Sequence, residues 1–256
     1  AYSLYHKIFE NSSDFTFLIS GDFEISKVLP LVQKYLGNLP EVWGVKIDYS
    51  IPLNIKPIPQ ESSFHYFPSQ GNYKMKNISY GTRYIQYDSV PSGREKLKVY
   101  ALGEILRQKL WDLRFKKGYA FYDLTAGGLY NESLKRLEIM ASLECDPKEF
   151  VMLRKEVKVV FSELKSGSFS DKELKNALTR MYSIYDLNKA SDPKIHSQKI
   201  YEHYRYGHPW VNPSEVAKFV KSISVKDVVE VANKYCTNEN FYEFVMSDIK
   251  PEKLIK

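Results

Sequence analysis

Cysteine, glycine, proline and long apolar runs are all scarce in this sequence. Two cysteines among 256 residues, Cys145 and Cys236, can form at most one disulfide, which excludes a small domain built on a disulfide framework. No stretch approaches the roughly 20 apolar residues of a membrane-spanning helix, so no membrane span is expected. With only 12 glycines and 12 prolines, collagenous and low-complexity chains are excluded as well. A hydrophobic fraction of 43% then indicates a folded globular chain.

Positive charge is present but is not concentrated in one segment. The 37 lysines and arginines exceed the 31 acidic residues by six, and the pI is near 9.0. Lysines stand beside acids, as in Glu95, Lys96 and Lys98, a pattern typical of solvated helix faces. We therefore expect no nucleic-acid partner. An unrelated basic binding domain remains an alternative, and a steep salt dependence of heparin or nucleic-acid binding would indicate it.

Hydrophobic periodicity predicts a series of strands and helices. Strands are expected over 15–22, over 77–89 with a break near Gly81, over 119–126 with an end at Gly127 and Gly128, over 137–145 and over 241–246. Helices are expected over 28–36 and 94–113, from Asp146 to Gly167, from Ser170 onward, over 193–206 and 213–221, and from Ser224 onward. Because the strand pairs are hairpin-spaced, this order predicts an α+β fold: an antiparallel β-sheet packed on one face by helices.

The two ends of the chain contain a short repeat. Residues 15–22 (FTFLISGD) match residues 241–248 (FYEFVMSD) without gaps, and chance similarity between two amphipathic strands is the alternative explanation. If the repeat is real, residues 1–38 are the tail, a strand and a helix, of a preceding homologous domain. Residues 39–60, which carry four prolines, would be a linker, and 61–256 a complete second domain. The chain would then be part of a longer tandem protein.

Three segments carry a resemblance to a known family. They are residues 29–40 (LPLVQKYLGNLP), residues 113–121 (LRFKKGYAF) and residues 224–235 (SVKDVVEVANKY). In this order they resemble motifs of the insulinase/pitrilysin (inverzincin) family of zinc metallopeptidases. The resemblance implies tandem metallopeptidase-like α/β domains whose two halves close around a peptide. One domain of such peptidases carries His-x-x-Glu-His on a helix, where two histidines bind zinc and the glutamate activates the zinc-bound water.

The zinc motif is absent from this chain. None of the five histidines, which are His6, His65, His196, His203 and His208, stands in a His-x-x-Glu-His segment. The helix at 94–113 would correspond to the motif helix, with Ala101 and Ile105 at the two ligand positions. We therefore expect no cofactor and no peptidase activity in this chain alone, and zinc in a catalytic domain outside it. A different metal site, formed by His196, His203 and His208 with Glu202, is a less favoured alternative.

The resemblance also implies candidate substrate-binding residues. In the family, an arginine and a tyrosine of the non-catalytic half hydrogen-bond the peptide and help stabilise the oxyanion. Arg114 matches the arginine, although a solvated arginine favoured by the helix dipole is an open alternative. The tyrosine position is Phe121, which cannot donate a hydrogen bond, and Tyr119 and Tyr122 flank it; Tyr122 could serve through a one-residue shift or a bulge. The substrate-binding candidates are therefore Arg114, Tyr119 and Tyr122.

A tyrosine-rich basic set could add a binding wall for acidic or aromatic peptides, or could simply pack neighbouring helices. Its members are Tyr182, Tyr185, Tyr201, Tyr204 and Tyr206 with Lys194, Lys199 and Arg205.

The function predicted first is the non-catalytic, substrate-binding and chamber-closing part of a zinc metalloendopeptidase. Its expected partners are the catalytic N-terminal half of the same parent protein and a peptide substrate. The alternative is a zinc-less structural or assembly subunit related to mitochondrial processing peptidase or to respiratory-complex core proteins. A His-x-x-Glu-His motif upstream would distinguish the two. The sequence leaves the cellular compartment and the substrate open.

Overall fold

The structure is a computed structural model, and it describes residues 2–9, 12, 15–40, 64–68, 76–184, 193–209 and 212–249. Contacts within the chain divide it into two units. The N-terminal unit comprises residues 1–55 and 187–211, and the sheet unit comprises 56–186 and 212–256. Each unit is described by itself. The predicted linker at 39–60 lies almost entirely outside the described residues.

The helices follow the predicted pattern closely. They are α1 (Tyr2–Phe9), α2 (Ile25–Tyr35), α3 (Gly93–Phe115), α4 (Phe150–Ser166), α5 (Asp171–Ile184), α6 (Pro193–Tyr206), α7 (Pro213–Ser222) and α8 (Val225–Tyr235). The helix start predicted at Ser224 is confirmed, and it is a capping box: the Ser224 hydroxyl accepts from the Asp227 N–H, and Asp227 accepts from the Ser224 N–H. In the described part of the chain, no helix has the length and hydrophobicity needed to cross a membrane.

The start of α4 differs from the prediction. A helix beginning at Asp146 was expected, but α4 begins at Phe150. The Asp146 side chain accepts a hydrogen bond from the backbone N–H of Lys148 at 2.8 Å, and this closes a turn before the helix. The predicted stop is confirmed, since Gly167 adopts a left-handed conformation with φ of 74°.

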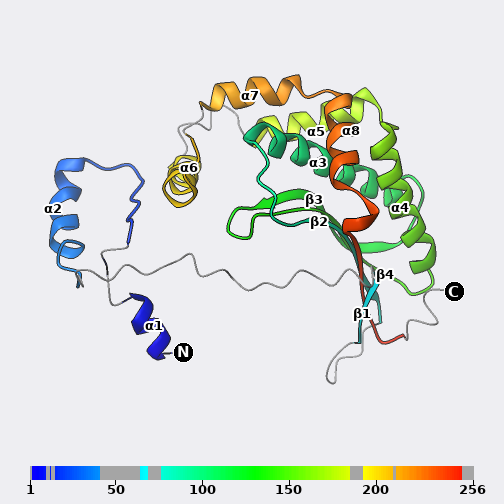
Figure 1. The fold of residues 1–256 in the computed structure, drawn as a ribbon, viewed down its shortest axis with the longest axis horizontal. Helices are drawn as coiled ribbons and strands as arrows, with labels where there is room; N and C mark the ends of the chain where they lie inside the picture. The colour runs from blue at the N-terminus through cyan, green and yellow to red at the C-terminus, as the bar shows by residue number, and fades with distance from the viewer. Residues whose placement is uncertain are drawn as a thin grey trace. The chain divides into compact units, whose positions relative to one another are not determined.

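Five strands form one sheet in the described chain, and helices α3, α4 and α8 lie on one side of it (Figure 1). The strands are β1 (Phe64–Pro68), β2 (Ile78–Gln86), β3 (Phe121–Asn131), β4 (Arg136–Cys145) and β5 (Phe241–Ser247), in the order β1-β5-β2-β4-β3. All neighbouring strands are antiparallel except β1, which runs parallel to β5 and was not predicted. The predicted helix-packed sheet is confirmed, with this one parallel pair at its edge.

Three strand predictions were wrong in detail. Residues 15–20 form neither helix nor strand, because a strand needs a neighbour for its backbone hydrogen bonds and the described N-terminal unit offers none. Gly81 does not break β2, since it pairs with Ser142 on one side and Phe244 on the other. Likewise, β3 continues through Gly127 and Gly128 to Asn131.

α3 packs its backbone directly on β3 at Gly128, whereas a Cβ atom placed on the neighbouring Gly127 would meet nothing within 4 Å. A Cβ atom placed on Gly103 of α3 would lie 2.0 Å from the backbone nitrogen of Gly128. One placed on Gly128 would lie 2.4 Å from the carbonyl oxygen of Val99. Such distances are far inside van der Waals contact, so any side chain at either position must push the helix away from the sheet. Glycine at 103 and 128 therefore sets how closely α3 approaches β3.

A buried carboxylate joins the sheet to α4. Glu243 of β5 is only 2% exposed, and it accepts hydrogen bonds from the Tyr80 hydroxyl at 2.8 Å and from the Lys158 ammonium at 3.0 Å. Arg154 donates two more, from Nε at 2.9 Å and Nη2 at 2.7 Å. Burial alone would raise the pKa of Glu243, but the hydrogen bonds from Arg154 and the other two donors hold it below its usual value. Glu243 is thus an ionised, fully paired group inside the fold.

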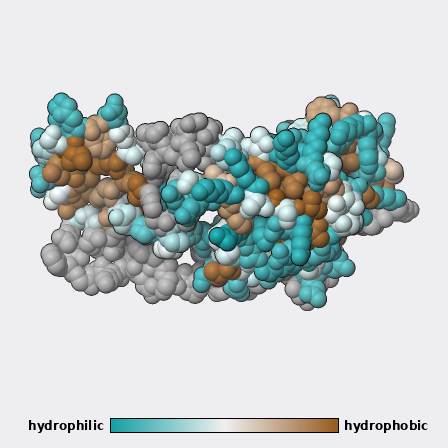
Figure 2. Space-filling model, turned by 90° about the horizontal axis from the view of Figure 1, so that it is seen from above, coloured by the Kyte–Doolittle hydropathy of each residue, from teal (hydrophilic) through white to brown (hydrophobic). Residues whose placement is uncertain are grey.

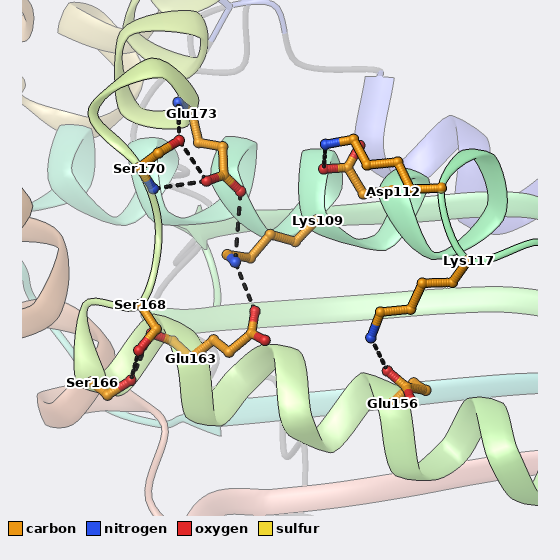
Figure 3. Close-up of polar contacts among 10 residues, drawn as sticks. Lys109, Asp112, Lys117, Glu156, Glu163, Ser166, Ser168, Ser170 and Glu173 are labelled. Carbon is orange, nitrogen blue, oxygen red and sulfur yellow. Dashed lines mark hydrogen bonds and ion pairs between the residues drawn. The ribbon is translucent and has the colours of Figure 1, made fainter.

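Ion pairs tie the helices together above the sheet. The Lys109 ammonium of α3 lies between Glu163 of α4, at 2.7 Å, and Glu173 of α5, at 3.6 Å (Figure 3). A second pair, Lys117 with Glu156 at 2.7 Å, joins the end of α3 to α4. Each such pair near the surface contributes only about 0–1 kcal/mol. They therefore orient the helices rather than supply most of the stability.

We predict that Gly103→Ala lowers the free energy of unfolding by about 3 kcal/mol, because the added methyl group overlaps backbone atoms of β3. Gly93→Ala is the matched control: it lies in the same helix, and a Cβ there meets nothing within 4 Å. The control should be neutral or stabilising by up to about 1 kcal/mol. Urea unfolding followed by circular dichroism measures both, and equal stabilities of the two variants would contradict the close approach.

Acid should destabilise the fold through its paired carboxylates. The pKa of Asp227 is lowered to about 2, where hydrogen bonds from Lys98 and Ser224 outweigh the raising effect of burial. The pKa of Glu243 is lowered as well. A lowered native pKa contributes stability above the unfolded value of about 4 and loses it as pH falls through the native value. We therefore expect a nearly constant free energy of unfolding from about pH 7 to about pH 5, and a continuous loss from there towards pH 2.

The variant Glu243→Gln shows how much of this loss of stability in acid comes from Glu243. It should cost about 3 kcal/mol near neutral pH, because Arg154 and Lys158 lose their buried counter-charge, and its stability should depend less on acid than that of the wild type. Urea unfolding between pH 2.5 and 7 checks both effects. Parallel curves for the two proteins would show that Glu243 does not titrate in the native state with a lowered pKa.

Candidate substrate-facing site

The last turn of α3 and the first residues of β3 come together at a short loop. α3 starts at the Ser92 cap, whose hydroxyl accepts from the Glu95 N–H, and ends at Phe115. The loop reverses with Gly118 in a left-handed conformation at φ 79°, which glycine adopts without strain. Arg114, in the last turn, is thereby held beside the start of β3.

Arg114 is half-buried and lies among aromatic rings. Its Nη1 atom donates a hydrogen bond to the backbone carbonyl of Phe121. Its guanidinium carbon lies 5.1 Å from the ring centre of Tyr122 and 6.0 Å from those of Trp111 and Phe115. These are cation–π distances. Among the described residues Arg114 has no acidic partner within ion-pair distance, unlike the neighbouring Lys116 and Lys117.

Tyr122 shares this surface, and Phe121 does not. Phe121 is fully buried, whereas the Tyr122 side chain is 53% exposed. The register of β3 against β4 shifts between Tyr122 and Thr125, and Asp123 in this bulge has a φ of 48°. A bulge redirects the side chains next to it. The structure therefore brings Arg114 and Tyr122 together at a bulged part of β3.

Tyr119 is held elsewhere. Its hydroxyl donates to the Glu156 carboxylate of α4 at 3.4 Å, and the same carboxylate pairs with Lys117. The tyrosine ring packs against the hydrophobic core of the sheet unit. Of the three sequence candidates, the structure places Arg114 and Tyr122 on one surface and ties Tyr119 to α4.

Two residues of this surface, Trp111 and Phe115, were not predicted from the sequence. Their rings stack at 5.5 Å with an angle of 23° between the planes, and Phe115 is 74% exposed. Four residues apart on one helix, they share a helical face. The four-residue spacing is visible in the sequence, but it does not tell a buried helix face from an exposed one.

The strand that begins at this surface is a free edge. β3 is the last strand of the described sheet, and it hydrogen-bonds only to β4. An edge strand of 11 residues leaves backbone N–H and carbonyl groups available to an extended chain. The site thus combines unpaired backbone groups, a guanidinium and exposed aromatic rings.

The residues of α3 do not fit a zinc site. Ala101 and Ile105, at the positions that would match the two histidine ligands, are fully buried and carry no ligand atom. No group of three or more His, Cys, Asp or Glu side chains among the described residues could hold a metal ion. In the alternative cluster, the His203 ring lies 2.7 Å from the backbone carbonyl of His208. The side chain of His196 lies outside the described residues.

The two cysteines are not nucleophiles. Cys145 and Cys236 are free and buried, and burial raises the pKa of each thiol to about 12. A thiol with such a pKa is protonated at neutral pH, whereas the thiolate is the reactive form. The chemistry of the candidate site therefore consists of hydrogen bonding, charge and aromatic contact.

The members of the tyrosine-rich set belong to both units, and each unit is considered by itself. Tyr182 belongs to the sheet unit, where the Lys221 ammonium lies 4.2 Å from its ring centre. Tyr201 and Tyr206 are on α6 of the N-terminal unit, with ring centres 6.0 Å apart. Tyr185 lies outside the described residues. These tyrosines carry no argument about a common binding wall.

Solved structures share the fold. The chain superposes with a TM-score of 0.65 and 16% identity on a mutant of the ferredoxin protease FusC in complex with Arabidopsis ferredoxin, covering 90% of this chain and 24% of that one. It superposes on the periplasmic protease PqqL from Escherichia coli with a TM-score of 0.64 and 15% identity, covering 90% and 25%. On the peptidase M16 inactive domain from Pseudomonas fluorescens it superposes with a TM-score of 0.64 and 16% identity. That superposition covers 90% of this chain and 53% of the other. At such identities these likenesses show the fold alone.

The chain spans about a quarter of the first two proteins and about half of the third. No curated protein sequence matches it. A family model does: the one described as peptidase M16 inactive domain matches residues 2–181, which is more than half of the chain. Two of the three segments that resemble insulinase-type peptidases, 29–40 and 113–121, lie inside that match. The chain therefore belongs to the peptidase M16 family, in which it corresponds to the inactive domain.

Proposed function

We propose that this chain is the non-catalytic, substrate-binding and chamber-closing part of a zinc metalloendopeptidase. The observation that carries the proposal is Arg114, a half-buried guanidinium without an acidic partner among the described residues, held beside the free edge of β3. Zinc and the water that attacks the peptide bond would be supplied by the catalytic N-terminal half of the same parent protein. The residues of this chain would bind and orient the peptide opposite that centre.

Arg114 suits the role because its donors are only partly used. One N–H is taken by the Phe121 carbonyl, and this bond fixes the plane of the guanidinium. The remaining donors can serve a peptide carbonyl, and more strongly the negative charge that develops on it as water attacks. The exposed Tyr122 hydroxyl could provide the second hydrogen bond that Phe121 cannot give. Tyr119, which is tied to Glu156, would support the loop instead.

Residues 1–38 would complete a preceding homologous domain. Helix α2 has no buried residue, and its apolar positions Ile25, Leu29 and Leu31 are 50–74% exposed. The segment before it exposes Phe17, Leu18 and Ile19 by 41–49%. A helix with so strong an apolar face normally packs it against a core, and the missing core would be the rest of that domain.

The first test is Arg114→Ala in the full-length parent protein. For a peptide without acidic residues we expect kcat to fall about 10- to 100-fold with a small change in KM, because the arginine then acts mainly on the charge of the transition state. Arg114→Lys should recover part of the rate. Lys116→Ala, two residues further on and paired with Asp112 at 2.7 Å, is the control and should be unaffected. An unchanged kcat in Arg114→Ala would remove the assigned role and favour the zinc-less assembly subunit.

The second test concerns the exposed face of the N-terminal segment. Deleting residues 1–38 from the chain should lower the fluorescence of bound anilinonaphthalene sulfonate by more than about half, since most of the exposed apolar side chains go with it. The circular dichroism melting temperature of the sheet unit should stay within about 3 °C, because its core contains none of these residues. Undiminished dye binding would show that residues 1–38 do not present an apolar face in solution.

A further inference from the structure

The rings around Arg114 form a surface that the role of the arginine alone does not require. We call Trp111, Phe115 and Tyr122 the aromatic platform. Phe115 is 74% exposed and Tyr122 is 53% exposed, although both are large aromatic side chains. Exposed rings that gather in one place, unlike single ones, mark a surface that contacts a partner.

The hydrophobic core of the sheet unit fixes the position of the aromatic platform. Phe121 is fully buried in the core, and the ring of Trp111 lies 6.1 Å from it. Trp111 in turn stacks on Phe115 at 5.5 Å. Phe115 is therefore positioned through Trp111 by the core itself, while most of its surface faces water. A ring fixed in this way can stack on an incoming side chain with little loss of conformational freedom.

The charge beside the platform is not neutralised. Lys116 pairs with Asp112 at 2.7 Å and Lys117 pairs with Glu156 at 2.7 Å, so both neighbouring cations have acidic partners. Arg114 has none among the described residues. Three ring centres lie 5.1–6.0 Å from its guanidinium carbon, and its one hydrogen bond among the described residues goes to the Phe121 carbonyl, so its other N–H donors can serve a ligand. An acidic group is the acceptor that such donors bind most strongly.

The spacing of the two features matches an extended peptide. The guanidinium carbon of Arg114 lies 6.0 Å from the ring centre of Phe115. In an extended chain, side chains two positions apart point to the same side and are separated by about 6–7 Å. An acidic residue and an aromatic residue at positions i and i+2 could therefore reach Arg114 and Phe115 together. The free edge of β3 begins at the same place.

We infer that the aromatic platform and Arg114 form a recognition site for an extended peptide that carries an acidic residue and an aromatic residue two positions apart, and that Phe115 sets the preference for the aromatic residue. The inference rests on the proposed substrate-binding function and names the class of substrate. It also assigns separate parts to neighbouring residues: Arg114 reads the charge and Phe115 reads the ring.

The test measures binding of fluorescein-labelled peptides to the 256-residue chain by fluorescence anisotropy. Four peptides are identical except for one motif: Asp-x-Phe, Asn-x-Phe, Asp-x-Ala, and Asp-Phe-x with the ring moved by one position. We expect Asp-x-Phe to bind at least about tenfold more tightly than each of the others. Phe115→Ala should bring Asp-x-Phe and Asp-x-Ala within about twofold of each other, and should keep the preference for Asp over Asn.

Arg114→Gln should do the reverse, losing the preference for Asp and keeping the preference for Phe. Phe67→Ala is the control, because Phe67 of β1 is also exposed, at 47%, and also stacks on a neighbouring ring, that of Phe244. It should leave all four affinities unchanged. Circular dichroism spectra of the variants verify the fold, which the removal of a mostly exposed ring should not disturb.

Three results would overturn the inference, and the first two separate it from the proposed function. If the chain binds all four peptides equally and Arg114→Gln weakens every one of them, the platform does not select, yet the arginine still binds peptide. A preference for Phe that persists in Phe115→Ala would overturn the assignment to that residue. If none of the peptides binds at any concentration tested, both the inference and the substrate-binding function fail.

Discussion

The approach of α3 to β3 without intervening side chains is the constraint on which the candidate site depends. Gly103 and Gly128 allow the two backbones to meet, and a methyl group on either would lie 2.0–2.4 Å from main-chain atoms. Because the middle of the helix is fixed on the strand, its last turn ends close to the start of the same strand. The Arg114 guanidinium can then reach the Phe121 carbonyl across the short loop. A wider spacing would separate the arginine from Tyr122.

The ion pairs of the sheet unit fall into two groups that contribute differently to the free energy of unfolding. Glu243 is 2% exposed and holds Arg154 and Lys158, and breaking a buried arrangement of this kind costs several kcal/mol. The pair of Lys117 with Glu156 lies nearer the surface, where such a pair is worth about 0–1 kcal/mol, and Lys109 adds a partly buried pair with Glu163. Both groups consume cations that would otherwise be available to a ligand. Arg114 takes part in neither group: among the described residues it has no acidic partner, and its guanidinium instead donates to the Phe121 carbonyl.

The sequence predicted those parts of the fold that local pattern decides. The strand predicted over 137–145 and the helix start predicted at Ser224 were confirmed, because side-chain period and cap chemistry are local properties. Gly127 and Gly128 were misinterpreted as the end of a strand, although β3 continues through both and Gly128 is required by the packing of α3 on the strand. Strand β1 was missed because its parallel pairing with β5 joins residues far apart in the chain. The strand expected at 15–22 has no partner strand in the described chain, which no local pattern reveals.

The same division applies to the site. Arg114 could be found through the family resemblance, and Tyr122 through its position next to Phe121. Trp111 and Phe115 were passed over because tryptophan and phenylalanine four residues apart on a helix normally belong to a buried stripe. Only the tertiary structure shows that Phe115, the last residue of α3, is exposed to water. Exposure of a hydrophobic residue is decided by what the rest of the chain fails to cover.

In helix α3, the positions that would match the zinc ligands and the residues that we propose to contact a substrate lie in different parts of the helix. The positions that would match the histidine ligands are Ala101 and Ile105, and both are fully buried in the apolar layer between helix and sheet. Imidazole ligands there would cost stability unless a metal and hydrogen-bond partners compensated their burial, so apolar residues suit a domain without zinc. At the end of the helix, polar side chains carry no such cost of burial, because this part of the helix lies at the surface. There, the chain exposes an arginine and aromatic rings at a cost in solubility, and the peptide contact that we propose would offset that cost.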